Sequence, residues 1–363
     1  MRIAFFGSSL VSSYWNGAAT YYRGLLRELA ACGHGITFYE PDAFERQQNR
    51  DMADPDWARI AVYPATDDGW RRALEEAVDD ADLVVKASGV GVFDRELELA
   101  VPEVVRAGTI TIYWDVDAPA TLETIAADAD HHLRRMIPRY DLVLTYGGGD
   151  PVVRDYKRAG ARECVPIYNA LDPRTHHPVA PRADLRCDLS FLGNRLPDRE
   201  ARVAEFFLAP ARRHRDKSFL LGGAGWRAED APTNVRVAGH VGSREHNAFY
   251  CSGLATLNVN RSSMARYGFS PPTRIFEAAG AGACIITDAW DGIGCFLTPG
   301  EEIFVAASGD DVAAILGSLA PDKARRVGAA AMARVREEHT YAHRAKQVVE
   351  LLDAATISSE AAE

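Results

Sequence analysis

Short apolar runs alternate with amphipathic stretches along the whole chain. Runs rich in Val, Ile, Leu and Phe are typical of strands buried on both faces of a parallel sheet. Between them, a stretch such as Thr20–Cys32 places Leu25 and Leu29 on one helical face, and Gly33 follows as a stop. Alternating strands and helices predict an α/β fold with doubly wound, Rossmann-like sheets. The runs form two series, Arg2–Phe6, Ile36–Tyr39, Leu83–Val85, Thr109–Trp114, Leu142–Thr145 and Cys164–Ile167, then Leu189–Leu192, Ser218–Leu221, Val235–Ala238, Ala255–Val259, Cys284–Thr287 and Ile303–Val305.

A linker separates the two series near Ile167–Pro178, in the segment YNALDPRTHHP. Two prolines and a turn-forming aspartate follow a strand there, as in a connection between domains. The length of 363 residues also favours two domains at about 150 residues each. We therefore expect two doubly wound domains facing each other across a cleft. The predicted order is one domain over 1–170, a second over 171–340, a terminal helix over 341–353 and a flexible tail over 354–363.

The composition is that of an ordinary globular protein, with 47% hydrophobic and 25% charged residues. This excludes a disordered, collagen-like or coiled-coil chain. Lys and Arg total 41 against 51 for Asp and Glu, which gives a net charge of −10. An acidic balance argues against a broad nucleic-acid or anionic-membrane surface but leaves room for a local basic pocket.

The six cysteines form no CxxC pair, and none lies at zinc-ligand spacing from a histidine. Scattered thiols of this kind are typical of a reducing compartment, so we expect a cytoplasmic protein. No run of about 18 apolar residues occurs, so no transmembrane segment is expected. The histidine pairs His131–His132 and His176–His177 are adjacent, so their side chains diverge in regular structure. We therefore assign no metal site.

The segment Ser270–Asp288, SPPTRIFEAAGAGACIITD, has the strongest chemical pattern. Two prolines precede a helix, and glycines end it before a strand. Arg274 and Glu277 are three residues apart and share one helix face. A helix N-terminus with an arginine suits a phosphate, and a glutamate one turn later suits the hydroxyls of a ribose. The alternative is a surface Arg–Glu pair.

The segment RIFEAAGAGACIITD closely resembles the donor-binding segment of GT-B glycosyltransferases, in particular the CgeB-like (spore-maturation-protein-like) group. Other stretches agree in order and spacing, mainly in the C-terminal half. This resemblance implies that the second domain binds a nucleotide-sugar donor and the first presents the acceptor. The supporting stretches are DLSFLGNRLPDRE, GHVGSREHNAFYCSGLATLNVNRSS, EEHTYAHRAKQVVELL and IYNALD.

The resemblance also implies a role for individual residues. Glu277 would hold the donor ribose, and Arg274 would bind the diphosphate and stabilise its charge during transfer. Phe269 occupies the position at which many retaining enzymes carry a second glutamate, eight residues before the ribose-binding one. The phosphates and sugar would lie near the backbone of Gly193 and Asn194, with Arg199, Arg195 or Arg261 as a second cation, and the base near Gly239 and His240.

Candidates in the first domain are fewer. Gly17, in a small-residue loop before a helix, is a candidate phosphate contact or part of a plain turn. The aromatic residues around it, Trp15, Tyr21 and Tyr22, form either an acceptor platform or part of the core.

Asp115 and Asp117 follow a predicted strand in the segment YWDVD. The carboxyl end of a parallel strand is the ligand side of such a sheet. The two aspartates are candidates for binding an acceptor hydroxyl, or for a catalytic base if the reaction inverts. The alternative is that they cap the loop.

Together these features predict transfer of a sugar from a nucleotide-diphosphate sugar, with a UDP-sugar favoured, to an unidentified small molecule, glycan or protein. No metal and no cofactor other than the donor is expected. One alternative is a catalytically silent nucleotide-sugar-binding protein, because Phe269 replaces a familiar site residue. The other is an NAD-dependent oxidoreductase, for which Gly7 and Glu40 are in place but the glycine fingerprint is incomplete.

Overall fold

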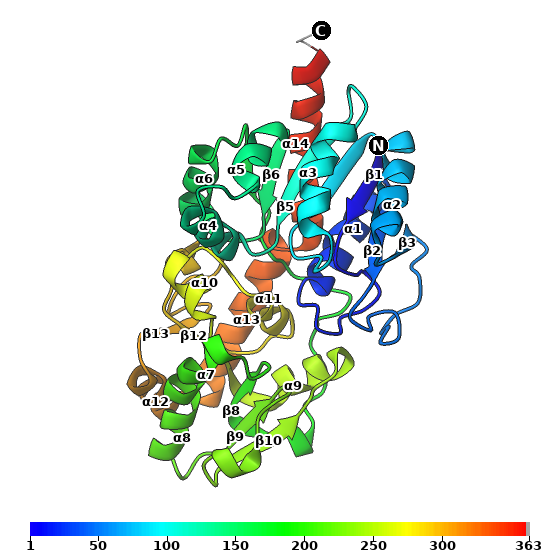
Figure 1. Cartoon of the computed structure of the whole chain (residues 1–363). Helices are drawn as coiled ribbons and strands as arrows, with labels where there is room; N and C mark the ends of the chain where they lie inside the picture. The colour runs from blue at the N-terminus through cyan, green and yellow to red at the C-terminus, as the bar shows by residue number, and fades with distance from the viewer. Residues whose placement is uncertain (361–363) are drawn as a thin grey trace. The chain divides into compact units, whose positions relative to one another are not determined.

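The computed structural model of the protein describes residues 1–360 and contains two compact units (Figure 1). The first comprises Met1–Asn169 together with the C-terminal segment from Tyr341, and the second comprises Ala170–Thr340. The expected boundary at residue 170 lies one residue from this division. The terminal segment, expected as a separate element, belongs to the first unit.

The first unit contains a seven-stranded parallel sheet in the order β3-β2-β1-β4-β5-β6-β7. Six of its strands follow the apolar runs of the sequence, but β3 was not expected. This strand lies at the sheet edge, and although it contains the apolar run Ile60–Tyr63, Tyr63 is its one buried residue. The strands are β1 Arg2–Phe6, β2 Gly35–Asp42, β3 Ala58–Pro64, β4 Leu83–Ala87, β5 Ile110–Asp115, β6 Leu142–Thr145 and β7 Cys164–Pro166.

Helices connect these strands, and the C-terminal helix α14 packs against α1. The approach is close at Gly24, where an added Cβ would lie 2.2 Å from the ring of Tyr341. A residue without a side chain is therefore required at this crossing. The helices are α1 Ala19–Ala31, α2 Asp67–Asp80, α3 Asp94–Val104, α4 Ala118–Ala127, α5 Leu133–Met136, α6 Gly149–Arg158 and α14 Tyr341–Glu360.

The predicted flexible tail over 354–363 is wrong for residues 354–360, which continue α14 as helix. Ala354 and Ala355 are strong helix formers, and no Gly or Pro interrupts the chain before Glu360. Residues of this kind can extend a helix that packing has already nucleated. Positions 361–363 of this prediction lie outside the described residues.

The second unit contains a six-stranded parallel sheet in the order β10-β9-β8-β11-β12-β13, and all six strands match predicted runs within two residues. Its core packs buried residues such as Phe191, Phe207 and Ile286 between sheet and helices. The strands are β8 Cys187–Leu192, β9 Phe219–Gly222, β10 Val235–Gly239, β11 Gly253–Asn258, β12 Ile285–Asp288 and β13 Phe304–Ala306. The helices are α7 Pro197–Val203, α8 Ala209–Arg213, α9 His246–Ser252, α10 Ser262–Tyr267, α11 Thr273–Gly280, α12 Gly309–Ser318 and α13 Pro321–Glu338, with a π-helical turn at Ala204–Leu208.

In each sheet, successive strands are added first toward one edge and then toward the other. This switch occurs between β1 and β4 in the first sheet and between β8 and β11 in the second. In such sheets, ligands bind beyond the carboxyl ends of the strands at this switch point. In the second unit, β8 leads into Gly193 and β11 leads into Val259. The loops at these two positions define the place to look for a site.

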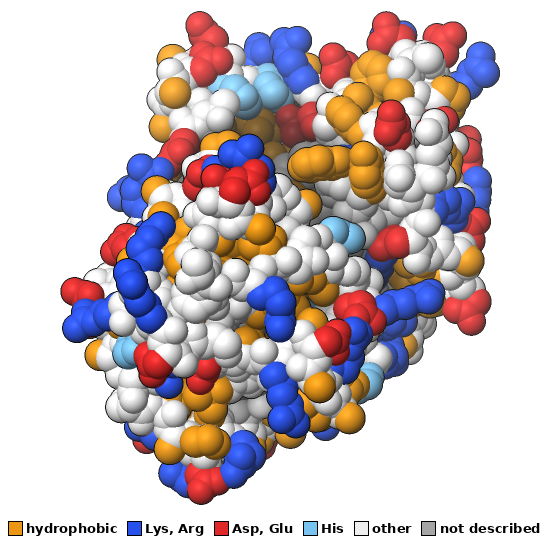
Figure 2. All heavy atoms as spheres, turned by 90° about the horizontal axis from the view of Figure 1, so that it is seen from below, with side chains coloured by type: hydrophobic (Ala, Val, Ile, Leu, Met, Phe, Trp, Pro, Cys, Tyr) orange, Lys and Arg blue, Asp and Glu red, His pale blue; other side chains and the backbone are white. Residues whose placement is uncertain are grey.

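Basic and acidic side chains are interspersed on the face shown in Figure 2, without a continuous basic area there. Within residues 1–360, no helix is both long enough and apolar enough to span a bilayer. All six cysteines are free thiols.

Candidate functional site

Two arginines converge on Gly193 at the switch point of the second sheet. A Cβ added to Gly193 would lie 3.0 Å from Nη1 of Arg199 and 3.4 Å from Nη1 of Arg274. Arg199 comes from α7, which follows the β8 loop, and Arg274 comes from the first turn of α11. Three of the residues selected from the sequence therefore meet at one point.

Neither guanidinium has a counter-ion among the residues that the structure describes. Arg199 donates to the carbonyl oxygen of Asn194 at 3.4 Å, and Arg274 donates to neutral oxygens. Arg199 is buried, and its Nε has no hydrogen-bond partner within the described chain. Burial, followed by the charge of Arg274, lowers the pKa of Arg199 to about 9. Two such guanidinium groups beside a bare glycine backbone form a site for an anion.

Arg274 is held in place by the ends of two strands. Its Nε donates to Oδ1 of Asn258 at 3.4 Å, and its Nη2 donates to the carbonyl oxygen of Val259 at 3.3 Å. Its guanidinium also lies 5.9 Å from the ring centroid of Phe191. Asn258 in turn donates to Oγ1 of Thr287 at 3.0 Å. These supporting contacts fix the direction of the Arg274 side chain before any ligand binds.

Asp288, the last residue of β12, fixes the loop that follows β11. Its carboxylate is buried and accepts the backbone N–H of Asn260 at 3.1 Å. Arg202 forms an ion pair with it at 2.5 Å, and burial raises the pKa of Asp288. This acid therefore serves the architecture of the site rather than its ligand.

The sequence left three arginines as candidates for the second cation, and the structure separates them. Arg195 forms ion pairs with Glu200 and Asp230 on the surface. Arg261 is bonded through Nε to Asp198. Arg199 alone of these three lies at Gly193 together with Arg274.

Glu277 lies one turn beyond Arg274 on α11 and is buried, with 7% of its surface exposed. It does not pair with Arg274 in the described structure, which contradicts the alternative of a surface Arg–Glu pair. Tyr250 donates to its Oε2 at 3.4 Å. Burial, and then the charge of Glu277, raises the pKa of Tyr250. Within the described residues, this carboxylate is therefore buried without a cation of its own.

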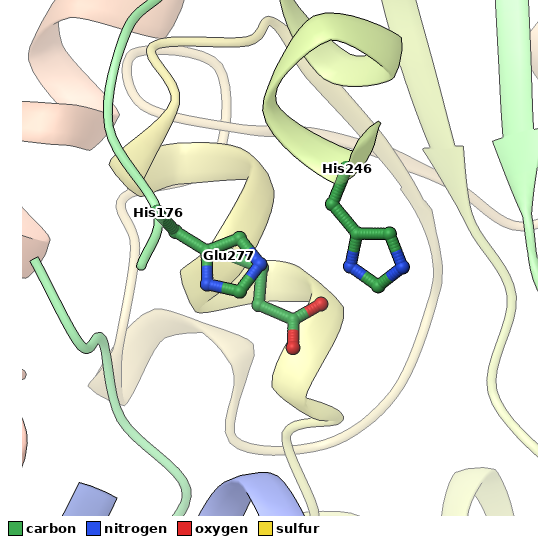
Figure 3. A group of neighbouring side chains, drawn as sticks. All are labelled: His176, His246 and Glu277. Atoms are coloured by element: carbon green, nitrogen blue, oxygen red, sulfur yellow. The ribbon is translucent and has the colours of Figure 1, made fainter. Parts of the chain in front are cut away.

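Two histidines that the sequence pattern did not single out as a pair lie beside Glu277. His176, His246 and Glu277 each offer one potential ligand atom, and these atoms lie within 4.8 Å of one another (Figure 3). Burial lowers the pKa of His246. His176 and His246 are 70 positions apart, so no local spacing in the sequence indicates that they meet.

The backbones of the loops after β8, β9 and β10 lie close together beside the two arginines. A Cβ added to Gly223 would lie 2.2 Å from the carbonyl oxygen of Gly193, so glycine is required for this close approach. Gly223 also donates to the carbonyl oxygen of Gly239 at 2.7 Å. Gly239 has φ +71° and faces open space, and His240 beside it is exposed. Both residues are thus accessible to a ligand, and their assignment to the base stays a prediction.

Phe269 precedes α11 and adopts a left-handed backbone with φ +46°. Its N–H donates to the carbonyl oxygen of Asp291 at 2.6 Å. Its ring covers Gly292, where an added Cβ would lie 2.3 Å from Phe269 Cδ1. A non-glycine residue in this conformation is held there by its surroundings, a feature that is enriched in functional sites.

In the first unit, Asp115 is fully buried. Its oxygens accept hydrogen bonds from Ser88 Oγ at 2.7 Å, from Thr121 Oγ1 at 3.1 Å, from the N–H of Asp117 at 3.0 Å and from the Tyr156 hydroxyl. Burial raises the pKa of Asp115. A carboxylate engaged in this way favours the loop-capping alternative. Asp117 stands directly before α4, at the N-cap position.

Gly17 lies on the exposed turn before α1, and a Cβ added to it would have no atom within 4 Å. Tyr21 and Tyr22 are 1% exposed and belong to the core. Trp15 is 75% exposed, with φ +48°. The aromatic residues therefore divide between core and surface.

Comparison with known proteins finds similarity to one family and to several solved structures. Residues 199–350 match the family described as "Glycosyl transferase-like". Two doubly wound parallel sheets of this kind, matched over nearly the full length by glycosyltransferase structures, constitute the GT-B fold. The chain has the GT-B fold, and its second half resembles a glycosyltransferase family. The CgeB-like group remains a prediction.

Several solved structures have a similar fold, all at low sequence identity to this chain. Sucrose-phosphate synthase from Thermosynechococcus elongatus matches with a TM-score of 0.71 at 14% identity, covering 99% of this chain and 100% of that one. HepE from Anabaena, in complex with UDP and glucose, matches with a TM-score of 0.67 at 14% identity, covering 98% and 100%. An α-glucosyltransferase in complex with UDP and DNA matches with a TM-score of 0.70 at 11% identity, covering 97% and 99%. No curated protein matches the chain in sequence.

Proposed function

We propose that the protein transfers a sugar from a UDP-sugar to an acceptor and binds the donor in its second unit. The observation that carries this proposal is the convergence of Arg199 and Arg274 on Gly193 at the sheet's switch point, without a counter-ion among the described residues. A diphosphate supplies the missing negative charge and matches the planar donor groups of arginine.

The remaining parts of the donor follow from this anchor. Arg274 and Glu277 are three residues apart on α11, which is about 4.5 Å along a helix axis. With the diphosphate at Arg199 and Arg274, the ribose lies over Glu277, whose carboxylate accepts its hydroxyl groups. The base then lies against the backbone of Gly239 and His240. Asn194 and Gly193 let the backbone approach the phosphates and the sugar.

The chemistry follows from where negative charge develops. As the bond from the anomeric carbon to the diphosphate breaks, charge accumulates on the leaving oxygens. Arg199 and Arg274, fixed before binding, stabilise that charge without reorganising. These two cations fill the role that a metal ion fills in other transferases, so we propose transfer without a metal.

The nature of the donor is supported by the structural neighbours. HepE has been crystallised with UDP-glucose and with UDP, and the α-glucosyltransferase has been solved in complex with UDP-glucose. The acceptor is a small molecule, a glycan or a protein. DNA accompanies UDP in one neighbour, but the net charge of −10 here makes an anionic polymer a poor acceptor.

A thermal-shift panel of UDP, GDP, ADP, dTDP and NAD tests the proposal. A ligand at a hundred times its dissociation constant stabilises the fold by about 2.7 kcal/mol, which is a readable shift. UDP is expected to stand out, and its effect is expected to vanish in Arg199→Ala but not in the surface control Arg195→Ala. A response to NAD alone would replace the transferase by an oxidoreductase.

A silent binding protein is the remaining alternative, and turnover separates it from an enzyme. UDP release from UDP-glucose, measured with and without sugar or peptide acceptors, is expected to exceed the uncatalysed rate and to depend on Arg274. Tight UDP binding without release of UDP from any UDP-sugar would favour the silent protein.

A further inference from the structure

His176, His246 and Glu277 form a cluster of polar side chains, in which His176 and Glu277 are buried and His246 is partly buried. The three side chains come from the linker after the first unit, from the start of α9 and from the middle of α11. One ligand-type atom of each lies within 4.8 Å of both others. Figure 3 shows the three side chains gathered at one place although they come from separate elements.

This cluster has unsatisfied polar atoms. Nε2 of His176 and Nδ1 of His246 are buried, and neither has a hydrogen-bond partner in the described part of the chain. Glu277 forms no ion pair within the described residues, and Tyr250 donates to its Oε2 at 3.4 Å. Buried polar groups are rarely left unsatisfied, and two imidazole nitrogens beside a carboxylate without a cation form an electron-rich pocket. A bound cation would satisfy all three.

We propose that His176, His246 and Glu277 form a binding site for a zinc-type divalent ion, whose occupancy excludes the donor nucleotide. Two imidazoles and one carboxylate are a ligand set that zinc accepts, with a fourth position for water. Nitrogen donors disfavour magnesium and calcium. A tetrahedral zinc ion needs its ligands about 3.4 Å apart, so side-chain rotations close the wider separations by roughly an ångström or more.

A second contact prepares one of the ligands. Nδ1 of His176 lies 2.9 Å from Oγ1 of Thr175. A hydrogen bond on one ring nitrogen orients the imidazole and leaves the other nitrogen to face the ion, as in many zinc sites. This contact leaves Nε2 of His176 as the nitrogen available to an ion.

The competitive effect rests on the proposed function, because it assumes that Glu277 holds the ribose. One carboxylate cannot accept the ribose hydroxyls and coordinate a cation in the same geometry. Zinc and UDP therefore bind one at a time, and zinc acts as an inhibitor that competes with the donor. This departs from the expectation that the chain has no metal site, while leaving the transfer step itself without a metal.

Titration of the nucleotide-free protein with Zn²⁺ against a chromophoric chelator tests the site. One equivalent is expected to bind to the wild type. The variants His176→Gln and His246→Gln keep a polar side chain but lose the imidazole, and their zinc affinity is expected to fall at least about tenfold. His177→Gln, next to the first ligand but outside the cluster, is the matched control and keeps wild-type affinity. Thermal melting verifies that all variants fold.

The proposed zinc site is refuted if the wild type binds no zinc, or if both glutamine variants bind zinc as tightly as the wild type. The competition is measured separately with UDP. At ten times the zinc dissociation constant, the apparent dissociation constant of UDP is expected to rise about tenfold. UDP affinity that zinc leaves unchanged overturns the competition. If UDP fails to bind even without zinc, the proposed function fails while the zinc titration still decides the metal site.

Discussion

Replacing Arg199 by methionine is expected to stabilise the free protein and to impair its activity. The burial of Arg199 and the nearby charge of Arg274 lower the pKa of Arg199 to about 9, well below the usual range of an arginine. At about 1.4 kcal/mol per pKa unit, the charged guanidinium costs the folded state roughly 5 kcal/mol. Methionine fills a similar volume without the charge. Because some packing and hydrogen bonding is lost, the net gain is about 1–3 kcal/mol.

The pH dependence of this gain has a definite sign. Below pH 9, Arg199 is charged in both the folded and the unfolded state, so the full cost is present in the wild type. Above pH 9 the folded state releases the proton first, and the cost declines. The stability advantage of Arg199→Met is therefore expected to be constant from pH 7 to pH 8 and to shrink above about pH 9.

Activity is expected to change in the opposite direction. Loss of one preorganised cation from a developing diphosphate lowers the rate of donor cleavage by about 10²-fold. Urea unfolding gives the stability and UDP release gives the rate. Arg195→Met, which loses two surface ion pairs with Glu200 and Asp230, is the control and changes both quantities little. If Arg199→Met is less stable than the wild type, or keeps its turnover, Arg199 is a structural residue and the reasoning is refuted.

Three further predictions concern the other candidate residues. Arg274→Ala is expected to lower kcat for UDP release by about 10²–10³-fold with a smaller change in KM, because its charge acts mainly on the leaving group; an unchanged kcat would remove it from the site. Glu277→Ala is expected to raise the donor KM and to abolish discrimination between UDP and 2′-deoxy-UDP in binding, and retained discrimination would assign the ribose elsewhere. Asp115→Asn is expected to destabilise the first unit by about 1–3 kcal/mol in urea unfolding and to leave kcat/KM near normal, whereas a large loss of kcat at normal stability would restore Asp115 as a catalytic candidate.

The sequence predicted strands well wherever burial on both faces leaves a continuous apolar run. Leu189–Leu192 and Cys284–Thr287 belong to this kind, and both strands lie within two residues of their predicted positions. The edge strand β3 was missed although it carries the short apolar run Ile60–Tyr63, because a run of four apolar residues does not by itself distinguish a strand from a helix or a loop. The flexible tail was predicted from its polarity, but helix propensity extends α14 to Glu360.

The geometry of the candidate site was predictable only where its residues lie on one element. Arg274 and Glu277 are fixed relative to each other by helix geometry, so their spacing could be interpreted directly. We select Arg199 rather than Arg195 or Arg261 as the second cation because the other two form ion pairs with acidic residues. Those neighbours are set by tertiary packing, and no spacing rule contains that information.

The convergence of His176 and His246 is a similar case, because it arises from a linker and a helix that pack together. Asn247, the residue after His246, accepts the N–H of His177 through Oδ1 at 3.2 Å and donates to the carbonyl oxygen of Thr175 at 2.9 Å. These two hydrogen bonds hold the linker against α9. The sequence shows that Asn247 follows His246, but it does not show that Asn247 binds the backbone of Thr175 and His177.

The charges along α11 fit the nucleotide ligand that we propose for this helix. Arg274 and Glu277 are spaced to form an ion pair, and such a pair is worth a few tenths of a kcal/mol on a helix surface. Instead Arg274 is turned toward Asn258 and Val259, and Glu277 is buried beside Tyr250. Separating the two charges leaves each without its nearest counter-ion, which costs free energy in the unliganded protein. A ligand that carries anionic groups at one end and hydroxyl groups one helical turn away recovers that cost, and a nucleoside diphosphate has this layout.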